Sequence, residues 1–119
     1  MMLLTKSIKD RLVKNYYKHK EAWNDEHPEY VESKAVVKLF NPYGPGDWYL
    51  SEMDPATGIC FGLCMIHEPE LGYVNIKELE ELDCGVGGVE RDKFFTSNRY
   101  GLDECREFIN AKYGLNSCL

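Results

Sequence analysis

The sequence of 119 residues has no hydrophobic run near the length of about 20 residues that spans a bilayer. Its amino-terminal apolar stretch is followed at once by charged side chains, so it is too short for a secretory signal. The five cysteines lack the dense spacing of a secreted disulfide scaffold. We therefore predict a cytoplasmic protein with free thiols and no membrane contact.

Motifs for known cofactors and metals are also lacking. Gly85, Gly87 and Gly88 precede no Lys-Ser or Lys-Thr pair, which a phosphate-binding loop requires. Cys60 and Cys64 fall in one apolar run that predicts a strand, where their side chains would lie about 13 Å apart. One zinc ion cannot bridge that distance. We therefore predict no metal and no cofactor, and a non-enzymatic protein is favoured over an enzyme.

The charge of the chain is unevenly distributed. Residues 1–20 hold six basic side chains and one acidic, a charge of +5, so the rest carries −11 against a total of −6. Apolar residues recur at helical spacing over 7–23 and predict an amphipathic helix. Its basic side chains are candidates for contact with a nucleic-acid backbone: Lys6, Lys9, Arg11, Lys14 and Lys18. In the alternative interpretation the helix folds back on the acidic body, or buries its apolar stripe in a homodimer.

The hydrophobic pattern of the remaining chain predicts an α+β fold. Strands are expected over 34–40, 47–53, 59–66 and 71–74, with a last strand within 86–95. Helices are expected over 7–23, 76–82 and 102–113. Short connections favour antiparallel pairing, so we predict a mainly antiparallel sheet of four to five strands with helices on one face or at one end. The domain division is 1–119 as a single unit, with a basic helix and acidic linker (1–33), a sheet core with the short helix (34–95) and a C-terminal helix region (96–119).

Two of the predicted strands carry more specific expectations. Period two places Trp48, Leu50 and Glu52 on one face of the strand 47–53, with Tyr49, Ser51 and Met53 on the other. The run 59–66 is apolar almost throughout, as expected of a central strand. Gly62 within that run indicates a bulge or a close approach by another segment.

The stretch EPELGYVNIKELEEL, residues 68–82, predicts a junction between a strand and a helix. Asn75 and Glu78 have the spacing of a capping box, and a glycine at position 85 is expected to close the helix. Gly72 is assigned to a requirement of the backbone. Four aliphatic residues of the stretch are assigned to the core: Leu71, Val74, Ile76 and Leu79. Glu70 and Tyr73 are left as polar groups where a strand end could open onto a groove.

Acidic side chains at strand ends and turns are the enzymatic candidates. Such groups bind Mg²⁺ or act as acid and base when they converge: Glu52, Asp54, Glu68, Glu70, Glu90 and Asp92. They also have structural interpretations, in which Asp54 caps a turn and Glu90 and Arg91 pair across strands. The candidate binding residues are Trp48, Glu52, Glu70, Tyr73, Glu90, Arg91 and Asp92.

Several short motifs occur together in one order: VKLF (37–40), Trp48 with Ser51-Glu52, FGL (61–63), PELGYVNIKEL (69–79) and VERD (89–92). In this order they resemble the bacterial family called domain of unknown function 2958, small proteins encoded largely on plasmids, phages and other mobile elements. The resemblance covers about residues 36–95, and it leaves the helices at 7–23 and 102–113 outside. It implies a genomic setting and brings no catalytic residues.

Three functions are consistent with these observations. The favoured one is an accessory or regulatory factor of a mobile genetic element that acts by binding a protein, because no catalytic motif is present. The second is a small metal-dependent hydrolase or nuclease-like enzyme that uses the strand-end carboxylates. The third is nucleic-acid binding through the basic helix.

Overall fold

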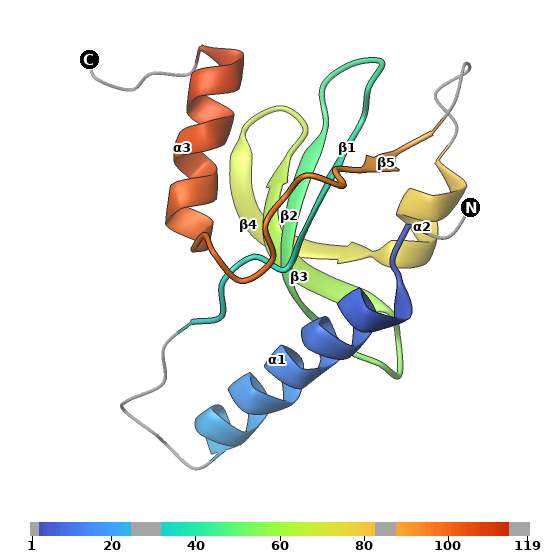
Figure 1. Cartoon of the computed structure of the whole chain (residues 1–119), viewed down its shortest axis with the longest axis vertical. Helices are drawn as coiled ribbons and strands as arrows, with labels where there is room; N and C mark the ends of the chain where they lie inside the picture. The colour runs from blue at the N-terminus through green and yellow to red at the C-terminus, as the bar shows by residue number, and fades with distance from the viewer. Residues whose placement is uncertain (1–2, 25–31, 83–87, 115–119) are drawn as a thin grey trace.

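The computed structural model describes residues 3–24, 32–82 and 88–114, which form one five-stranded sheet and three helices (Figure 1). The elements follow in the order α1 (Lys6–Asn24), β1 (Val37–Phe40), β2 (Asp47–Met53), β3 (Ile59–Met65), β4 (Pro69–Asn75), α2 (Ile76–Glu81), β5 (Glu90–Arg91) and α3 (Leu102–Tyr113). The predicted α+β fold is confirmed. Within these described ranges no helix has both the length and the apolar composition that crossing a membrane requires.

The sheet is antiparallel throughout, with the strand order β4-β3-β2-β1-β5. Strands β1 to β4 form a meander joined by tight turns, as short connections predict. The short β5 then adds beside β1, so β4 and β5 are the edge strands and β2 lies in the middle. All seven residues of β2 are buried. β3 lies between β4 and β2, so the expectation of a central strand within 59–66 is confirmed, although β2 is the middle strand of the five.

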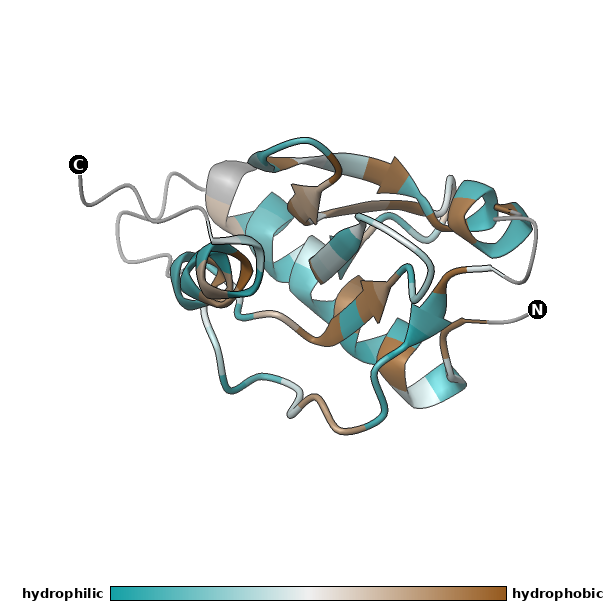
Figure 2. Ribbon diagram, turned by 90° about the horizontal axis from the view of Figure 1, so that it is seen from above, coloured by the Kyte–Doolittle hydropathy of each residue, from teal (hydrophilic) through white to brown (hydrophobic). Residues whose placement is uncertain are grey.

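Helices cover both faces of the sheet. Leu12 of α1 packs in a core cluster with Leu50, whereas Ile109 of α3 packs in a second cluster with Tyr49. Successive residues of a strand point to opposite faces, so α1 and α3 lie on opposite sides of the sheet. The expectation of helices on one face or at one end is corrected, since apolar side chains project from both faces and each face needs a cover. Figure 2 shows brown, apolar segments concentrated in the strands.

A β-bulge interrupts the pairing of β2 with β3. Leu50 pairs with Gly62, but the next paired residue is Glu52, opposite Phe61. The extra residue reverses the alternation beyond this point. Met53 therefore joins Leu50 in the cluster beneath α1, and the predicted division of β2 into two faces is wrong after the bulge.

Two glycines face each other across β3 and β4 and have different roles. A Cβ atom at Gly62 would lie 2.0 Å from the carbonyl oxygen of Tyr49, so the predicted close approach is confirmed. A Cβ atom at Gly72 would meet nothing within 4 Å, so the expected backbone requirement at Gly72 is wrong. Leu71 is 48% exposed rather than part of the core, because β4 is an edge strand.

The predicted turn at 54–58 and the predicted N-cap at Asn75 are confirmed, whereas the Glu78 contact of a capping box stays a prediction. Asp54 Oδ1 accepts a hydrogen bond from the backbone of Ala56, and Gly58 adopts a positive φ of 76°. Asn75 caps α2 by accepting from the backbone N–H of Lys77 at 2.9 Å. The expected closing glycine of α2, at position 85, lies outside the described residues.

Candidate functional site

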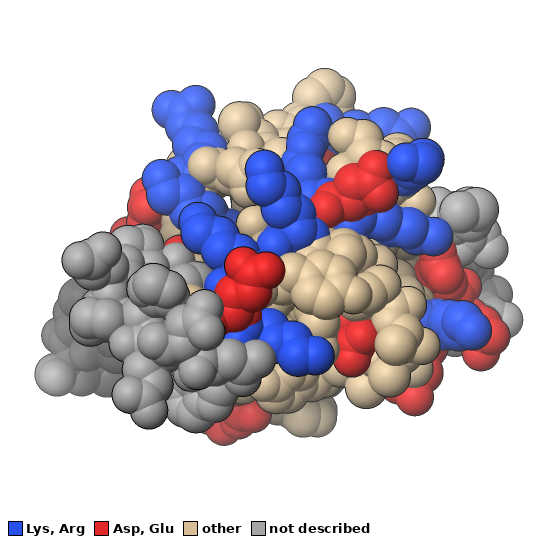
Figure 3. All heavy atoms as spheres, turned by 90° about the horizontal axis from the view of Figure 1, so that it is seen from below, with Lys and Arg blue, Asp and Glu red and all other residues tan. Residues whose placement is uncertain are grey.

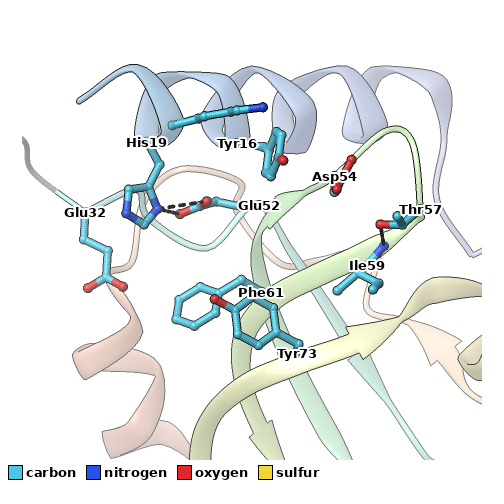
Figure 4. Close-up of a pocket in the computed structure, with 10 residues that line it drawn as sticks. Tyr16, His19, Glu32, Glu52, Asp54, Thr57, Ile59, Phe61 and Tyr73 are labelled. Atoms are coloured by element: carbon cyan, nitrogen blue, oxygen red, sulfur yellow. Dashed lines mark hydrogen bonds and ion pairs between the residues drawn. The ribbon is translucent and has the colours of Figure 1, made fainter. Parts of the chain in front are cut away.

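A pocket of about 660 Å³ opens beside the C-terminal half of α1 (Figure 4). The helix forms one wall, and the opposite side is formed by rings from β3 and β4. We call this cavity the α1 pocket. Its lining residues come from α1, the segment before β1, strands β2 to β4 and the β2–β3 turn: Tyr16, His19, Lys20, Glu32, Glu52, Asp54, Thr57, Ile59, Phe61 and Tyr73.

The floor of the α1 pocket is aromatic. Phe61 and Tyr73 are cross-strand partners in β3 and β4, and their ring centroids lie 5.2 Å apart at an interplanar angle of 56°. Tyr73 is 75% exposed and Ile59 is 40% exposed, although both are large and largely apolar. Because the sheet holds these side chains in register, the pocket presents a preformed apolar surface to a ligand.

A buried carboxylate stands in the wall of the pocket between the helix and the sheet. The side chain of Glu52 is only 6% exposed, and its two oxygens lie 3.1 and 3.0 Å from His19 Nδ1. Burial raises the pKa of Glu52 above its ordinary value, and the hydrogen bond and charge of His19 oppose this shift. The bulge in β2 places Glu52 opposite Phe61, next to the aromatic floor.

The α1 pocket has an acidic balance. Its charged lining comprises Glu32, Glu52 and Asp54 against Lys20 and the titratable His19. Sequence reasoning identified Glu52 and Tyr73 as binding residues, and the structure brings both into this pocket. It did not find the contributions of His19 or Glu32, because nothing in the local pattern places α1 against this end of β2.

A second, smaller cavity of about 450 Å³ lies at the β3–β4 hairpin and includes Glu68, Glu70 and Tyr73. We call it the hairpin pocket. The hydrogen bond and the charge of Glu68 raise the pKa of Glu70. Tyr73 lines both cavities, so the predicted Glu70–Tyr73 pair lies where they adjoin.

The other predicted binding residues lie elsewhere. Trp48 is buried in the cluster beneath α1. Glu90 and Arg91 pair with β1, at the opposite edge of the sheet from β4, and Arg91 Nη1 donates to the backbone oxygen of Leu3. Asp92 accepts from the backbone of Phe94 at 2.9 Å in the following turn. None of these residues lines the α1 pocket with Glu52. The contacts of Glu90 and Arg91 join β5 to β1 and to the segment before α1.

The carboxylates that could have formed one catalytic cleft occupy separate places. Glu52 and Asp54 line the α1 pocket, Glu70 lines the hairpin pocket, and Asp92 lies in a third depression near Lys38. In the described part of the chain, no three His, Cys, Asp or Glu side chains are placed to hold a metal ion.

Three thiols fall within the described ranges, and all three are free. Burial raises the pKa of Cys60 and Cys105 to about 12 and that of Cys64 to about 11. These thiols are therefore protonated at neutral pH, as expected of core cysteines rather than nucleophiles. Cys84 and Cys118 lie outside the described residues.

The basic side chains of α1 point away from the sheet. Figure 3 shows Lys and Arg gathered on the face that contains this helix. Of the five candidates for contact with a nucleic-acid backbone, Lys9 is partly exposed. The other four are exposed: Lys6, Arg11, Lys14 and Lys18. Leu12 and Ile8 pack on the sheet, so the helix folds back on its own body and buries these apolar residues there.

One cluster around a buried carboxylate was not found from the sequence. Asp47, the first residue of β2, accepts two contacts from Lys112 Nζ at 3.0 and 3.2 Å and a hydrogen bond from the Tyr113 hydroxyl. We call these three residues the Asp47 anchor. It ties the last turn of α3 to the start of β2. The sequence does show an acidic residue at the start of a strand rich in large apolar side chains, but no local pattern pairs this residue with α3.

The fold and the site define a class of small α+β domain with a helix-walled, acidic and aromatic pocket at one end of an antiparallel sheet. The profile of the family described as Protein of unknown function (DUF2958) matches residues 3–103, and the chain belongs to this family. The match is longer than the expected 36–95 and includes α1 and every residue that lines the α1 pocket, whereas Lys112 and Tyr113 lie beyond it. No match was found among curated proteins or among solved structures.

Proposed function

We propose that this protein is a non-enzymatic accessory or regulatory factor of a mobile genetic element, which acts by binding another protein through the α1 pocket. The observation that carries the proposal is the exposed aromatic surface of Tyr73 on an edge strand, beside a pocket with charged walls. Large apolar side chains exposed together beside polar groups are typical of interaction sites. The mobile-element setting rests on the resemblance of the sequence motifs.

The position of β4 also supports protein binding. It pairs only with β3 in the described sheet, so its other edge can pair with an extended segment of a partner. Edge strands are usually protected against such pairing, for example by proline or by charged side chains. Here Pro69 begins the strand and Arg106 Nη1 donates to its carbonyl oxygen, but Leu71 and Tyr73 follow with large exposed side chains.

The chemistry of the described residues favours binding over hydrolysis. The thiols have raised pKa values, and the carboxylates are divided among separate depressions. A nucleophile needs a nearby base, and a divalent metal needs several converging oxygens. The α1 pocket offers shape, apolar area and charge, which are the components of a recognition site.

Substitution of Tyr73 by serine tests the proposal, with Tyr43→Ser as the matched control. Tyr43 is 53% exposed but lies in the β1–β2 loop, away from the α1 pocket. The three proteins would be used for crosslinking in host cells, with recovered proteins quantified by mass spectrometry. We expect a set of partners that the wild type and Tyr43→Ser recover equally and Tyr73→Ser loses. Equal recovery by all three, or no reproducible partner for the wild type, would contradict the proposal.

The exposed basic face of α1 favours a second candidate function, contact with a nucleic-acid backbone. Arg11, Lys14 and Lys18 of α1 are exposed, and phosphate contacts made by them would be electrostatic and independent of sequence. The wild-type protein should shift duplex DNA in a gel, and this shift should weaken steeply as the salt concentration rises. Replacing these three residues by glutamate should abolish the shift. A shift that persists in the triple variant would exclude this face as the contact.

A further inference from the structure

The acidic groups of the α1 pocket have hydrogen-bonding capacity that the described residues do not fill. His19 approaches Glu52 through one nitrogen, whereas an ionised carboxylate offers about four lone-pair sites. Asp54 uses Oδ1 to accept from Ala56, and Glu32 stands at the exposed side of the pocket. An anionic ligand would be repelled by these three carboxylates, so the charge of the pocket selects for a cation.

The aromatic lining is suited to the same kind of ligand. Tyr16, Phe61 and Tyr73 come from three different elements and face the cavity from opposite sides (Figure 4). The faces of aromatic rings attract cations, and the methylene stems of lysine and arginine pack on apolar surface. The chain itself provides an example, because Lys20 Nζ lies 6.0 Å from the centroid of the Tyr16 ring. An apolar floor beneath carboxylates therefore matches a side chain with an apolar stem and a charged end.

The open edge of β4 indicates how such a side chain would be delivered. Tyr73 lies between the α1 pocket and the hairpin pocket, and the latter adds Glu68 and Glu70. A segment paired with β4 would pass between two acidic cavities. Its successive side chains would alternate between the two faces of the extended sheet, so a residue that points to the face of Tyr73 is directed to the aromatic floor.

We infer that the α1 pocket receives an arginine or lysine side chain, carried by an extended segment of a partner protein that pairs with β4. Glu52 and Glu32 bind the charged end, and Phe61 and Tyr73 pack against its stem. The inference rests on the proposed function and names the chemistry of the partner. Arginine fits better than lysine, because its planar guanidinium can stack on a ring and still donate to a carboxylate.

The test uses an array of short immobilised peptides of alternating threonine and valine, in which the central residue is varied. The wild type would be applied with Glu52→Gln, Tyr73→Ser and the control Glu107→Gln, whose glutamate is exposed on α3. We expect wild type and Glu107→Gln to bind peptides with central arginine at least about 10-fold more tightly than the neutral isostere citrulline, a difference expected for one charge-assisted contact. Glu52→Gln should remove this preference, and Tyr73→Ser should weaken binding to all the peptides.

The outcomes separate this inference from the proposed function. A preference for acidic or aliphatic central residues, or a preference for arginine that Glu52→Gln leaves unchanged, overturns the inference. If partner capture in cells still depends on Tyr73, the protein-binding function survives that result. Binding of no peptide above background also counts against the inference. Capture of only a second copy of this chain through Tyr73 would also overturn the inference, because the basic side chains of α1 are carried by a helix and not by an extended segment.

Discussion

Strand β2 carries a buried carboxylate near each end, and the two have different surroundings. Asp47 is 1% exposed at its side chain and is held by Lys112 and Tyr113 of α3. Glu52 is 6% exposed and is approached by His19 of α1, but it also lines a cavity of about 660 Å³. The first carboxylate is enclosed by donors from its own chain, and the second has room beside it for a donor from another molecule.

The difference separates a structural charge from the charge that we propose takes part in binding. At the Asp47 anchor, burial disfavours the charged form of Lys112, but the hydrogen bond and charge of Asp47 outweigh it and raise the pKa of the lysine. Burial and the hydrogen bond to Asp47 also raise the pKa of Tyr113. At Glu52 burial dominates, and the pKa of the carboxyl is raised despite His19. A buried carboxylate whose pKa stays raised, because too few donors stabilise its charge, is typical of sites that bind a ligand or react.

The largest expected effect is at Gly62, opposite the bulge that orients Glu52. A Cβ atom there would lie 2.0 Å from the Tyr49 carbonyl oxygen and 2.8 Å from the Cα of Leu50, both backbone atoms. We predict that Gly62→Ala lowers the free energy of unfolding by about 3 kcal/mol, the upper end of typical overpacking costs. Urea denaturation measures this. The matched control is Gly72→Ala, which should be neutral or slightly stabilising, and equal effects at both glycines would contradict the account.

The next effect is at the Asp47 anchor. Asp47→Asn removes the charge that Lys112 and Tyr113 contact, and hydrogen bonds to charged groups contribute about 1.5–3 kcal/mol. Since Lys112 is half exposed and can turn to solvent, we predict a loss of about 2 kcal/mol in the same denaturation experiment. Asp10→Asn should change stability by less than about 0.5 kcal/mol, because its ion pair with Lys6 is exposed. A loss at Asp47 no larger than that at Asp10 would show that the anchor is not structural.

A smaller and pH-dependent effect is expected at Glu52. Because its pKa is raised in the folded state above the ordinary 4.5, the native protein keeps this proton to higher pH than the unfolded chain. The stability present below pH 4.5 is therefore partly lost as the pH rises above that value. Glutamine does not ionise, so the Glu52→Gln variant should not lose stability in this way. The free energy of unfolding of the variant, relative to that of the wild type, should therefore increase between pH 4.5 and 7. Denaturation curves across this range test it, and a constant difference would contradict the raised pKa.

The smallest expected effect is at Tyr73. Its side chain is 75% exposed, so Tyr73→Ser should change the free energy of unfolding by no more than about 0.5 kcal/mol. Thermal unfolding monitored by circular dichroism measures this. A loss well above that value would show that the ring has a structural role, and the partner-capture experiment would then need a stability-matched variant.

Local features of the fold could be predicted from the sequence, and contacts between distant segments could not. The bounds of β2 and the cap at Asn75 follow from patterns within a few residues. The α1 pocket instead depends on a bulge in β2, whose sequence trace, Gly62, lies on the neighbouring strand. The contact between His19 and Glu52 joins residues 33 positions apart, and that between Lys112 and Asp47 joins residues 65 apart. Charge and periodicity carry no information on which of many acidic residues a distant donor will meet.

The most direct test compares the two buried carboxylates of β2 in one experiment. Wild type, Asp47→Asn and Glu52→Gln would be titrated into a fluorescein-labelled copy of the threonine-valine peptide with central arginine, at a temperature where all three proteins are folded. Urea denaturation of the same samples would measure their stability. We expect Asp47→Asn to lose stability and to keep its affinity for the peptide. We expect Glu52→Gln at neutral pH to stay within about 1 kcal/mol of wild type in stability, because loss of the His19 hydrogen bond offsets relief of the buried charge, and to lose at least about 10-fold in affinity. Equal losses of affinity in the two variants, or a loss confined to Asp47→Asn, would contradict the assignment of the functional site to the Glu52 end of the strand.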